Sequence, residues 1–163
     1  GLISRHQHGF LARRSTGTQL IDCLNDWTLT IEQKQSLDVI YIDFAKAFDS
    51  VVHCKLISKL TSYGITGNLL CWICSFLTDR HQCVIIDGFS SSTCRVFSGV
   101  PQGSVLGPIL FIVYINDVCD IVVGNTACIL FADDIKLYSF VDCNGVSDDL
   151  NTSLNNLVLW SKT

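Results

Sequence analysis

The spacing of apolar and polar residues changes several times along the chain, and each change predicts a different element. Apolar residues at helical spacing predict helices, whereas short runs of β-branched and aromatic residues between turn residues predict strands. The predicted helices begin near residues 16, 54, 67, 106 and 146, and the predicted strands cover residues 38–43, 82–87, 93–98, 127–132 and 135–140. Because helices and strands mix without regular alternation, the predicted fold class is α+β.

The predicted helices, the first and the third among them, carry apolar stripes that should face a core. The stripes consist of Leu20, Cys23 or Leu24, Trp27 and Ile31 in the first helix, and of Leu69, Ile73 and Phe76 in the third. Ser15 or Thr16 should cap the first helix, since a hydroxyl oxygen there can accept a backbone hydrogen bond. Asp49, just before the second helix, is expected to cap that helix rather than to bind a ligand.

Composition limits the possible functions. The chain has 163 residues, of which 48% are apolar and 16% charged, so it should form a folded core. Eleven basic against fifteen acidic residues give a net charge of −4, which argues against a free-standing nucleic-acid binder. The absence of an apolar run near 20 residues and an odd count of nine cysteines predict an intracellular protein, nuclear or cytoplasmic, with reduced thiols. A chain without methionine is expected to be a fragment of a longer reading frame.

Three acids stand at the ends of apolar strands. Asp43 ends the strand at 38–43, and Asp133 and Asp134 form the tip between the strands at 127–132 and 135–140. If the strands lie side by side, two or three carboxylates come together, and a divalent cation would relieve their repulsion. Ligands that are all oxygen favour Mg²⁺ or Mn²⁺, and two such ions suit phosphoryl transfer. On spacing alone, an ordinary turn at Asp133 and Asp134 is an equally good explanation.

Three motifs then change the interpretation. Residues 41–49 (YIDFAKAFD), 99–111 (GVPQGSVLGPILF) and 131–134 (FADD) occur in the order of the palm motifs of reverse transcriptases. The residues within these motifs resemble those of non-LTR retrotransposon polymerases of the jockey type. Residues 7–10 (QHGF) with 14–16 (RST) resemble the preceding fingers motif. The resemblance runs from about residue 7 to the end of the chain.

The resemblance implies a polymerase palm, an antiparallel sheet packed on helices, with partial fingers. Residues 1–36 would lead from the fingers into the palm, and residues 37–163 would form the palm core with a fingers-proximal hairpin at about 82–98. Asp43, Asp133 and Asp134 would be catalytic and would hold two Mg²⁺ or Mn²⁺ ions. The other implied site residues are Phe44, Ala45, Phe48, Gln102 and Gly103 for the nucleotide, and Arg13, Arg14, Pro101 and Ser104 for nucleic acid.

Some of these implied roles have plain structural alternatives. Phe48 would exclude a 2′-hydroxyl and so favour dNTPs, but an ordinary core aromatic explains it as well. Arg14 would face phosphates, although a solvated charge is an equal alternative. Gly103 would permit close approach of a ligand or a second backbone.

The implied function is RNA-directed DNA polymerisation. A primer 3′-hydroxyl would attack the α-phosphate of a dNTP, on an RNA or DNA template, and release pyrophosphate. The remaining fingers, the thumb and an endonuclease are expected in the rest of a parent polyprotein, so the chain alone should be weak or inactive. The alternatives are a non-catalytic retroelement remnant or interaction module that keeps the palm fold and, less favoured, a metal-dependent phosphatase or nuclease.

Overall fold

The computed structural model describes residues 2–141 and 148–162. The chain divides into two compact units, Gly1–Ala45 with Ile115–Thr163, and Lys46–Tyr114. The first unit contains α1 (Thr16–Glu32), β1 (Ser36–Ile42), the 3₁₀ helix η1 (Val118–Ile121), β6 (Ala127–Phe131), β7 (Asp134–Val141) and α5 (Asp148–Lys162). The second contains α2 (His53–Ser62), α3 (Gly67–Leu77), β2 (His81–Gln82), β3 (Ile85–Ile86), β4 (Phe89–Ser90), β5 (Cys94–Arg95) and nearly all of α4 (Leu106–Ile115).

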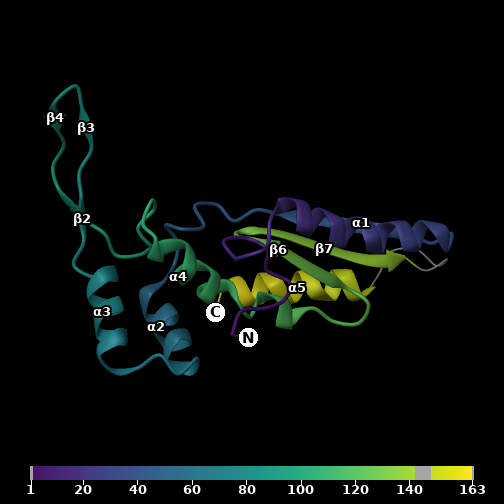
Figure 1. Ribbon diagram of the computed structural model, residues 1–163. Coiled ribbons are helices and arrows are strands. Elements are labelled where there is room, and N and C mark those ends of the chain that lie inside the picture. Colours follow the sequence, from purple (N-terminus) through teal and green to yellow (C-terminus); the bar gives the residue numbers. More distant parts are fainter. Residues whose placement is uncertain (1, 142–147, 163) are drawn as a thin grey trace. The chain divides into compact units, whose positions relative to one another are not determined.

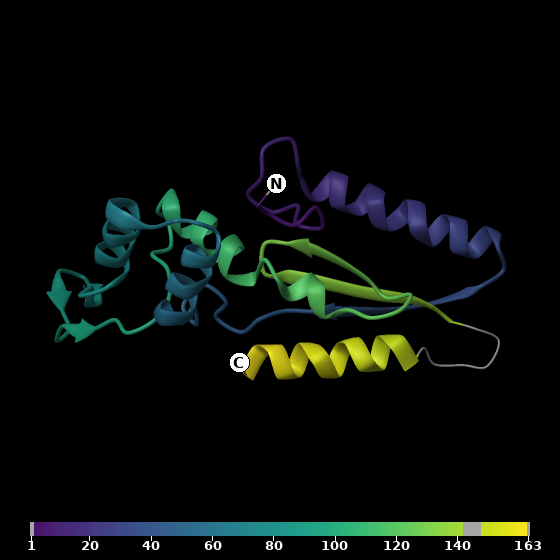
Figure 2. The ribbon, with the colours of Figure 1, turned by 90° about the horizontal axis from the view of Figure 1, so that it is seen from below.

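The first unit is built on a three-stranded sheet in the order β1-β7-β6, with both pairs antiparallel. Gln7 adds an isolated parallel bridge to Leu130 at the β6 edge. Helix α1 covers one face of the sheet and α5 covers the other (Figures 1 and 2). Helices packed on an antiparallel sheet confirm the predicted α+β class.

Alternation along the strands divides the core between the two faces of this sheet, because successive side chains point to opposite sides. On the α1 side, Cys23 packs with Ile129 and Tyr138. On the α5 side, Leu150 and Leu157 belong to a larger cluster. Its sheet and η1 members are Val118, Cys119, Cys128, Leu130, Ile135 and Leu137. The lead-in residues before β1 therefore belong to the same compact unit as the sheet.

Helix α1 begins as predicted and buries only part of the predicted stripe. Ser15 caps it through a capping box with Thr18. Cys23 is buried and Trp27 packs against the core as predicted, whereas Leu20 and Ile31 are 47% and 68% exposed. The buried residues of the helix are Gln19, Cys23 and Thr30. Polar pairing with the sheet explains why the buried face of α1 differs from the predicted one. Helix α1 supplies oxygen acceptors to strand β7: Gln19 Oε1 accepts from Lys136 Nζ, and Asp26 Oδ2 accepts from the Tyr138 hydroxyl.

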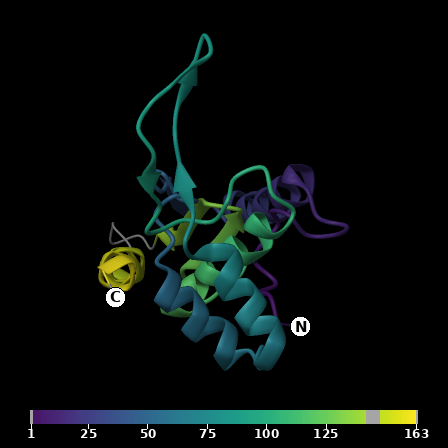
Figure 3. The same cartoon turned by 90° about the vertical axis from the view of Figure 1, so that its left-hand side faces the viewer.

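The second unit contains a helical pair and a hairpin. Helices α2 and α3 pack on one another, burying Leu56, Leu60, Ile73 and Leu77 (Figure 3). The predicted stripe on α3 is therefore only partly right, since Leu69 is exposed. The hairpin turns at Asp87-Gly88 as predicted, but its long strands are replaced by two ladders of two residues each, β2–β5 and β3–β4.

Several boundaries also differ from the sequence predictions. Helix α4 ends at Ile115, and the predicted continuation to Val118 is replaced by a break before η1. Asp49 does not cap α2, because the residue before that helix is Val52. The start predicted for the last helix, near residue 146, lies outside the described residues. None of the helices that the structure describes is long and apolar enough to cross a membrane.

Candidate active site

The predicted acids meet at one end of the three-stranded sheet. Strand β1 pairs with β7 up to Ile42–Ile135, so Asp43 follows directly beside Asp134, the first residue of β7. Asp133 lies in the two-residue turn between β6 and β7, whose last pair is Phe131–Asp134. Strand β7 therefore stands between β1 and β6, and it brings the three acids together from segments about 90 residues apart in the chain.

The carboxylates influence one another electrostatically. Partial burial raises the pKa of the Asp134 carboxyl above its usual range, and the charges of Asp133 and Asp43 raise it further. The nearby Lys136 ammonium opposes part of this rise. Asp43 and Asp134 are nevertheless exposed to solvent. Repulsion among like charges is the feature of this site that a cation would relieve.

A pocket of about 270 Å³ opens beside the acids, on the α1 side of the sheet. Its lining includes Asp43, Asp134, Lys136, Gln19 and Tyr41. The Lys136 ammonium donates to Gln19 Oε1 at 2.9 Å and lies 5.6 Å from the centre of the Tyr41 ring. The pocket therefore combines acidic oxygens with one nearly buried cation.

The donor set matches a hard cation, because the three side chains offer only carboxylate oxygens. Within residues 2–141 and 148–162, however, no three His, Cys, Asp or Glu side chains form a group that could hold a metal ion. The chemistry of the ligands thus fits Mg²⁺, whereas a closed three-carboxylate arrangement is not present in the structure.

The loop at residues 98–104 packs on the turn at 46–51 in the second unit. Val100 N donates to Phe48 O at 2.9 Å, and Ser98 Oγ donates to Asp49 O at 2.8 Å. The Gln102 amide approaches Asp49 Oδ1 at 3.4 Å. This contact within the second unit therefore includes Phe48 and Gln102, two residues for which the resemblance implies nucleotide binding.

Glycines allow this loop to form. Gly103 has φ +78° and no neighbouring atom within 4 Å of a would-be Cβ, so its backbone lies open. The Ser104 hydroxyl donates to Pro101 O at 2.6 Å and accepts from Gly107 N at 3.0 Å, which joins the loop to α4. Ser104 and Pro101 thus have clear structural roles in the loop. The ring of Phe48 stacks on Phe111 with centroids 4.5 Å apart, so it packs as a core aromatic does.

A model of the family described as reverse transcriptase (RNA-dependent DNA polymerase) matches residues 1–161. The chain belongs to the reverse transcriptase family. It is 32% identical to a probable RNA-directed DNA polymerase from transposon BS of Drosophila melanogaster, over 99% of this chain and 18% of that protein. It is 33% identical to the RNA-directed DNA polymerase from mobile element jockey of Drosophila funebris, over 86% of this chain and 16% of that protein.

Two solved telomerase structures share the fold. Telomerase from Candida albicans, in complex with a fragment of telomeric RNA, matches 95% of this chain and 29% of its own at a TM-score of 0.68 and 14% identity. Apo telomerase from Candida tropicalis matches 95% of this chain and 32% of its own, at a TM-score of 0.64 and 16% identity. The chain spans less than a fifth of the length of the two retrotransposon polymerases above.

The remaining predicted residues of this reverse transcriptase chain lie in the first unit. Phe44 is half-buried and packs against Trp160, with ring centroids 6.2 Å apart, whereas Ala45 is exposed. Arg13 is exposed, with φ +64°. Arg14 is partly buried and turned inward, since it donates to Arg5 O at 2.5 Å. Its guanidinium is therefore partly engaged within the unit.

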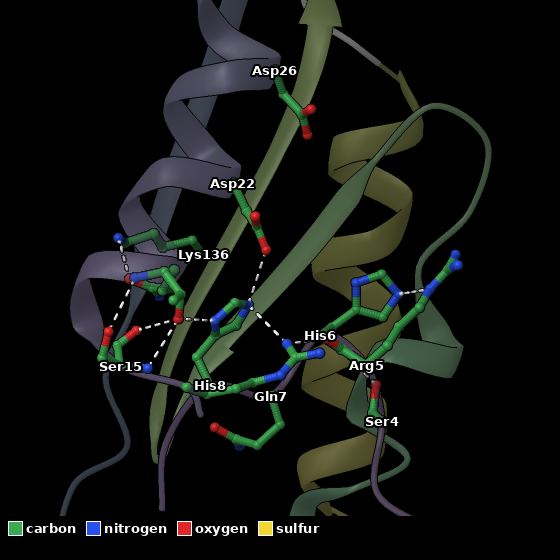
Figure 4. A network of polar contacts seen from close by, with 12 residues as sticks. Ser4, Arg5, His6, Gln7, His8, Ser15, Asp22, Asp26 and Lys136 are labelled. Atoms are coloured by element: carbon green, nitrogen blue, oxygen red, sulfur yellow. Dashed lines mark hydrogen bonds and ion pairs between the residues drawn. The ribbon is translucent and has the colours of Figure 1, made fainter. Parts of the chain in front are cut away.

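Sequence reasoning missed the polar network around His8, which Figure 4 shows in close-up. His8 is 3% exposed, and its Nε2 lies 3.1 Å from Arg14 Nη1 and 3.3 Å from Asp22 Oδ2. Its Nδ1 lies 3.0 Å from the Thr18 hydroxyl. Burial lowers the pKa of His8, and the Arg14 charge lowers it further while Asp22 opposes this. The network ties the QHGF segment to α1, which no spacing rule would indicate.

Proposed function

We propose that this chain is the catalytic centre of an RNA-directed DNA polymerase of a non-LTR mobile element. Its reaction would join the 3′-oxygen of a primer to the α-phosphorus of a dNTP, with loss of the hydroxyl proton and release of pyrophosphate. The observation that carries the proposal is the pairing of β1 with β7, which sets Asp43 beside Asp134 and next to Asp133.

Asp43, Asp133 and Asp134 would hold two Mg²⁺ or Mn²⁺ ions. When bound, such ions supply activation of the attacking hydroxyl and stabilisation of charge on the leaving oxygen. The chain's own carboxylates set the local negative charge, and the strand register supports their mutual proximity. Phe48, Gln102 and Gly103, with Phe44 and Ala45, would contact the dNTP.

The partners would be an RNA or DNA template and its primer. Family membership supports a nucleic-acid template. Arg13 and Arg14, with Pro101 and Ser104, would contact that nucleic acid. The inward bonds of Arg14 give it an additional structural role. Other fingers, thumb and endonuclease regions would belong to the parent protein, and a nuclear or cytoplasmic location stays a prediction.

Primer extension tests the proposal. A polymerase of the parent length should extend a primer on RNA with Mg²⁺, and Asp133→Asn should abolish extension, because the change removes charge but little volume. The 163-residue chain alone should extend the primer weakly or not at all. Near-normal extension by the Asp133→Asn variant would contradict the proposal and favour a palm fold that serves another role.

A further inference from the structure

The side chain of Gln7 is enclosed beside the turn that carries the acids. It is 1% exposed. Its carboxamide oxygen accepts from Ala132 N at 2.8 Å and from Gly9 N at 2.7 Å, and its nitrogen donates to Ala132 O at 3.2 Å. A single side chain therefore binds both backbone polar groups of Ala132, the residue immediately before Asp133.

The turn has a backbone conformation that its own sequence does not favour. Ala132 has φ +53°, a left-handed value that glycine or asparagine adopts more easily than alanine. It is also buried, at 5% exposure, so its N–H and C=O need partners within the protein. Gln7 supplies both partners. The turn conformation is therefore fixed by a contact across the fold.

The backbone on either side of Gln7 is hydrogen-bonded to the end of strand β6. His8 N donates to Leu130 O, and Leu130 N donates to His6 O, both at 2.9 Å. A Cβ on Gly9 would collide with Ala132 N and lie 2.8 Å from Ala132 Cα, so only glycine fits this close approach. Residues 6–9 therefore form a bracket against the end of β6, and Gln7 is its contact with the turn.

We propose that Gln7 is a positioning residue for the polymerase reaction, acting through the Ala132 backbone to hold Asp133 and Asp134 for metal binding. This inference rests on the proposed function of those acids. Residues that orient metal ligands without touching the metal themselves change metal affinity about 10- to 100-fold when they are removed. A residue that only stabilised the fold would not change metal affinity in this selective way.

The test compares two matched variants of the 163-residue chain. Gln7→Met keeps the side-chain length and removes all three hydrogen bonds. Asn156→Leu is the control. It removes a hydrogen bond that a side-chain amide donates to a backbone carbonyl, Ile121 O at 3.0 Å, elsewhere in the same unit. Binding of Mn²⁺ is measured by electron paramagnetic resonance, and thermal unfolding is measured on the same samples.

We expect Gln7→Met to weaken Mn²⁺ binding at least tenfold, while Asn156→Leu binds Mn²⁺ as the unchanged chain does. Gln7→Met with unaltered Mn²⁺ affinity would overturn the inference, whatever its melting temperature. Asp133→Asn separates this failure from that of the proposed function. If Asp133→Asn binds Mn²⁺ as the unchanged chain does, or if no form binds it, the acidic site itself is wrong and the inference falls with it.

A second measurement is independent of metal. Hydrogen exchange of the Ala132 amide should become at least tenfold faster in Gln7→Met, because its acceptor is lost, and should be unchanged in Asn156→Leu. Equal protection of Ala132 in all three proteins would show that Gln7 does not hold the turn. Loss of protection throughout the sheet in Gln7→Met would also overturn the inference, because Gln7 would then act on the fold as a whole.

Discussion

Two turns in this protein join antiparallel strands through two residues, yet they are held in different ways. Asp87-Gly88 joins β3 to β4 with φ values of +50° and +84°, and a Cβ on Gly88 would meet no atom within 4 Å. Ala132-Asp133 joins β6 to β7 with φ +53° at Ala132, which is enclosed. The first turn is open to solvent, whereas the second is hydrogen-bonded by Gln7 and closely packed against Gly9.

The contrast shows two sources of the same chain reversal. An Asp-Gly pair adopts positive φ readily, so the β3–β4 turn follows from its own residues. The Ala-Asp pair lacks this local preference, and the β6–β7 turn depends on tertiary contacts. A turn held by distant residues does not need a sequence that favours the turn, and this one carries Asp133 and leads directly into Asp134 at the start of β7. Substitutions in and around each turn test this difference.

The aspartate charge should be needed for primer extension in the β6–β7 turn and not in the β3–β4 turn. Asp133→Asn in a polymerase of parent length should reduce primer extension by at least about 100-fold, since losing a ligand should exceed the loss of an outer-layer partner. Asp87→Asn, the same change in the open turn, should leave extension unchanged. Equal loss in both variants would mean that the two turns do not differ in function.

Crowding at the bracket should affect folding stability. Gly9→Ala should lower the free energy of unfolding by about 1–3 kcal/mol, because the new methyl group meets the Ala132 backbone. Gly17→Ala is the control, since its Cβ would lie 3.5 Å from the Ser15 hydroxyl within α1, and it should stabilise the helix by about 0.5–1 kcal/mol. Urea unfolding of the 163-residue chain measures both. Equal stability of the Gly9→Ala variant would show that the close approach is not needed.

Acid should weaken the bracket through His8. Arg14 donates to Nε2, so the neutral ring carries its proton on Nδ1 and donates to Thr18. A protonated ring would instead bind Asp22 and repel Arg14. Burial and Arg14 lower the His8 pKa in the fold, so the unfolded chain binds the proton first. Stability should therefore fall as pH drops below about 6.5.

Thermal unfolding at about pH 7.5 and about pH 5.5 measures this dependence, at values on either side of the ordinary histidine pKa. His8→Gln should reduce the loss of stability between the two values. His81→Gln changes an exposed histidine in the other unit and should retain the full loss. A pH dependence that is the same in His8→Gln and the unchanged chain would contradict the assignment to His8.

The sequence predicted those features that local rules govern. Ser15 as the cap of α1, the turn at Asp87-Gly88 and the α+β class are all confirmed. The meeting of Asp43 with Asp134 was predicted only on the condition that the strands lie side by side. A strand at 135–140 was predicted, but its place between β1 and β6 was not. The QHGF motif was noted, but the contact of Gln7 with the turn could not be predicted, because no periodic or spacing signal indicates which distant residue a loop glutamine will meet. Its partner Ala132 lies 125 residues away.

The smallest effect expected is a stability gain at the acidic tip. The Asp134 pKa is raised in the fold, so the charged carboxylate is disfavoured there and lowers folding stability at neutral pH. This loss of stability disappears as pH falls through the folded pKa and below the ordinary aspartate value near 3.9. Asp134→Asn should therefore raise the melting temperature at neutral pH by about 1 °C, as expected for an exposed charge.

The gain should vanish in acid, and scanning calorimetry across the pH range checks both points. Asp87→Asn is again the control, with no change in melting temperature expected at either pH. Added Mg²⁺ should stabilise the unchanged chain more than the Asp134→Asn variant, because the ion would offset the repulsion that the substitution removes. If Asp134→Asn lowered the melting temperature at neutral pH, the carboxylate would be held by attractive partners. The three acids would then form a structural network, and the two turns would differ only in burial.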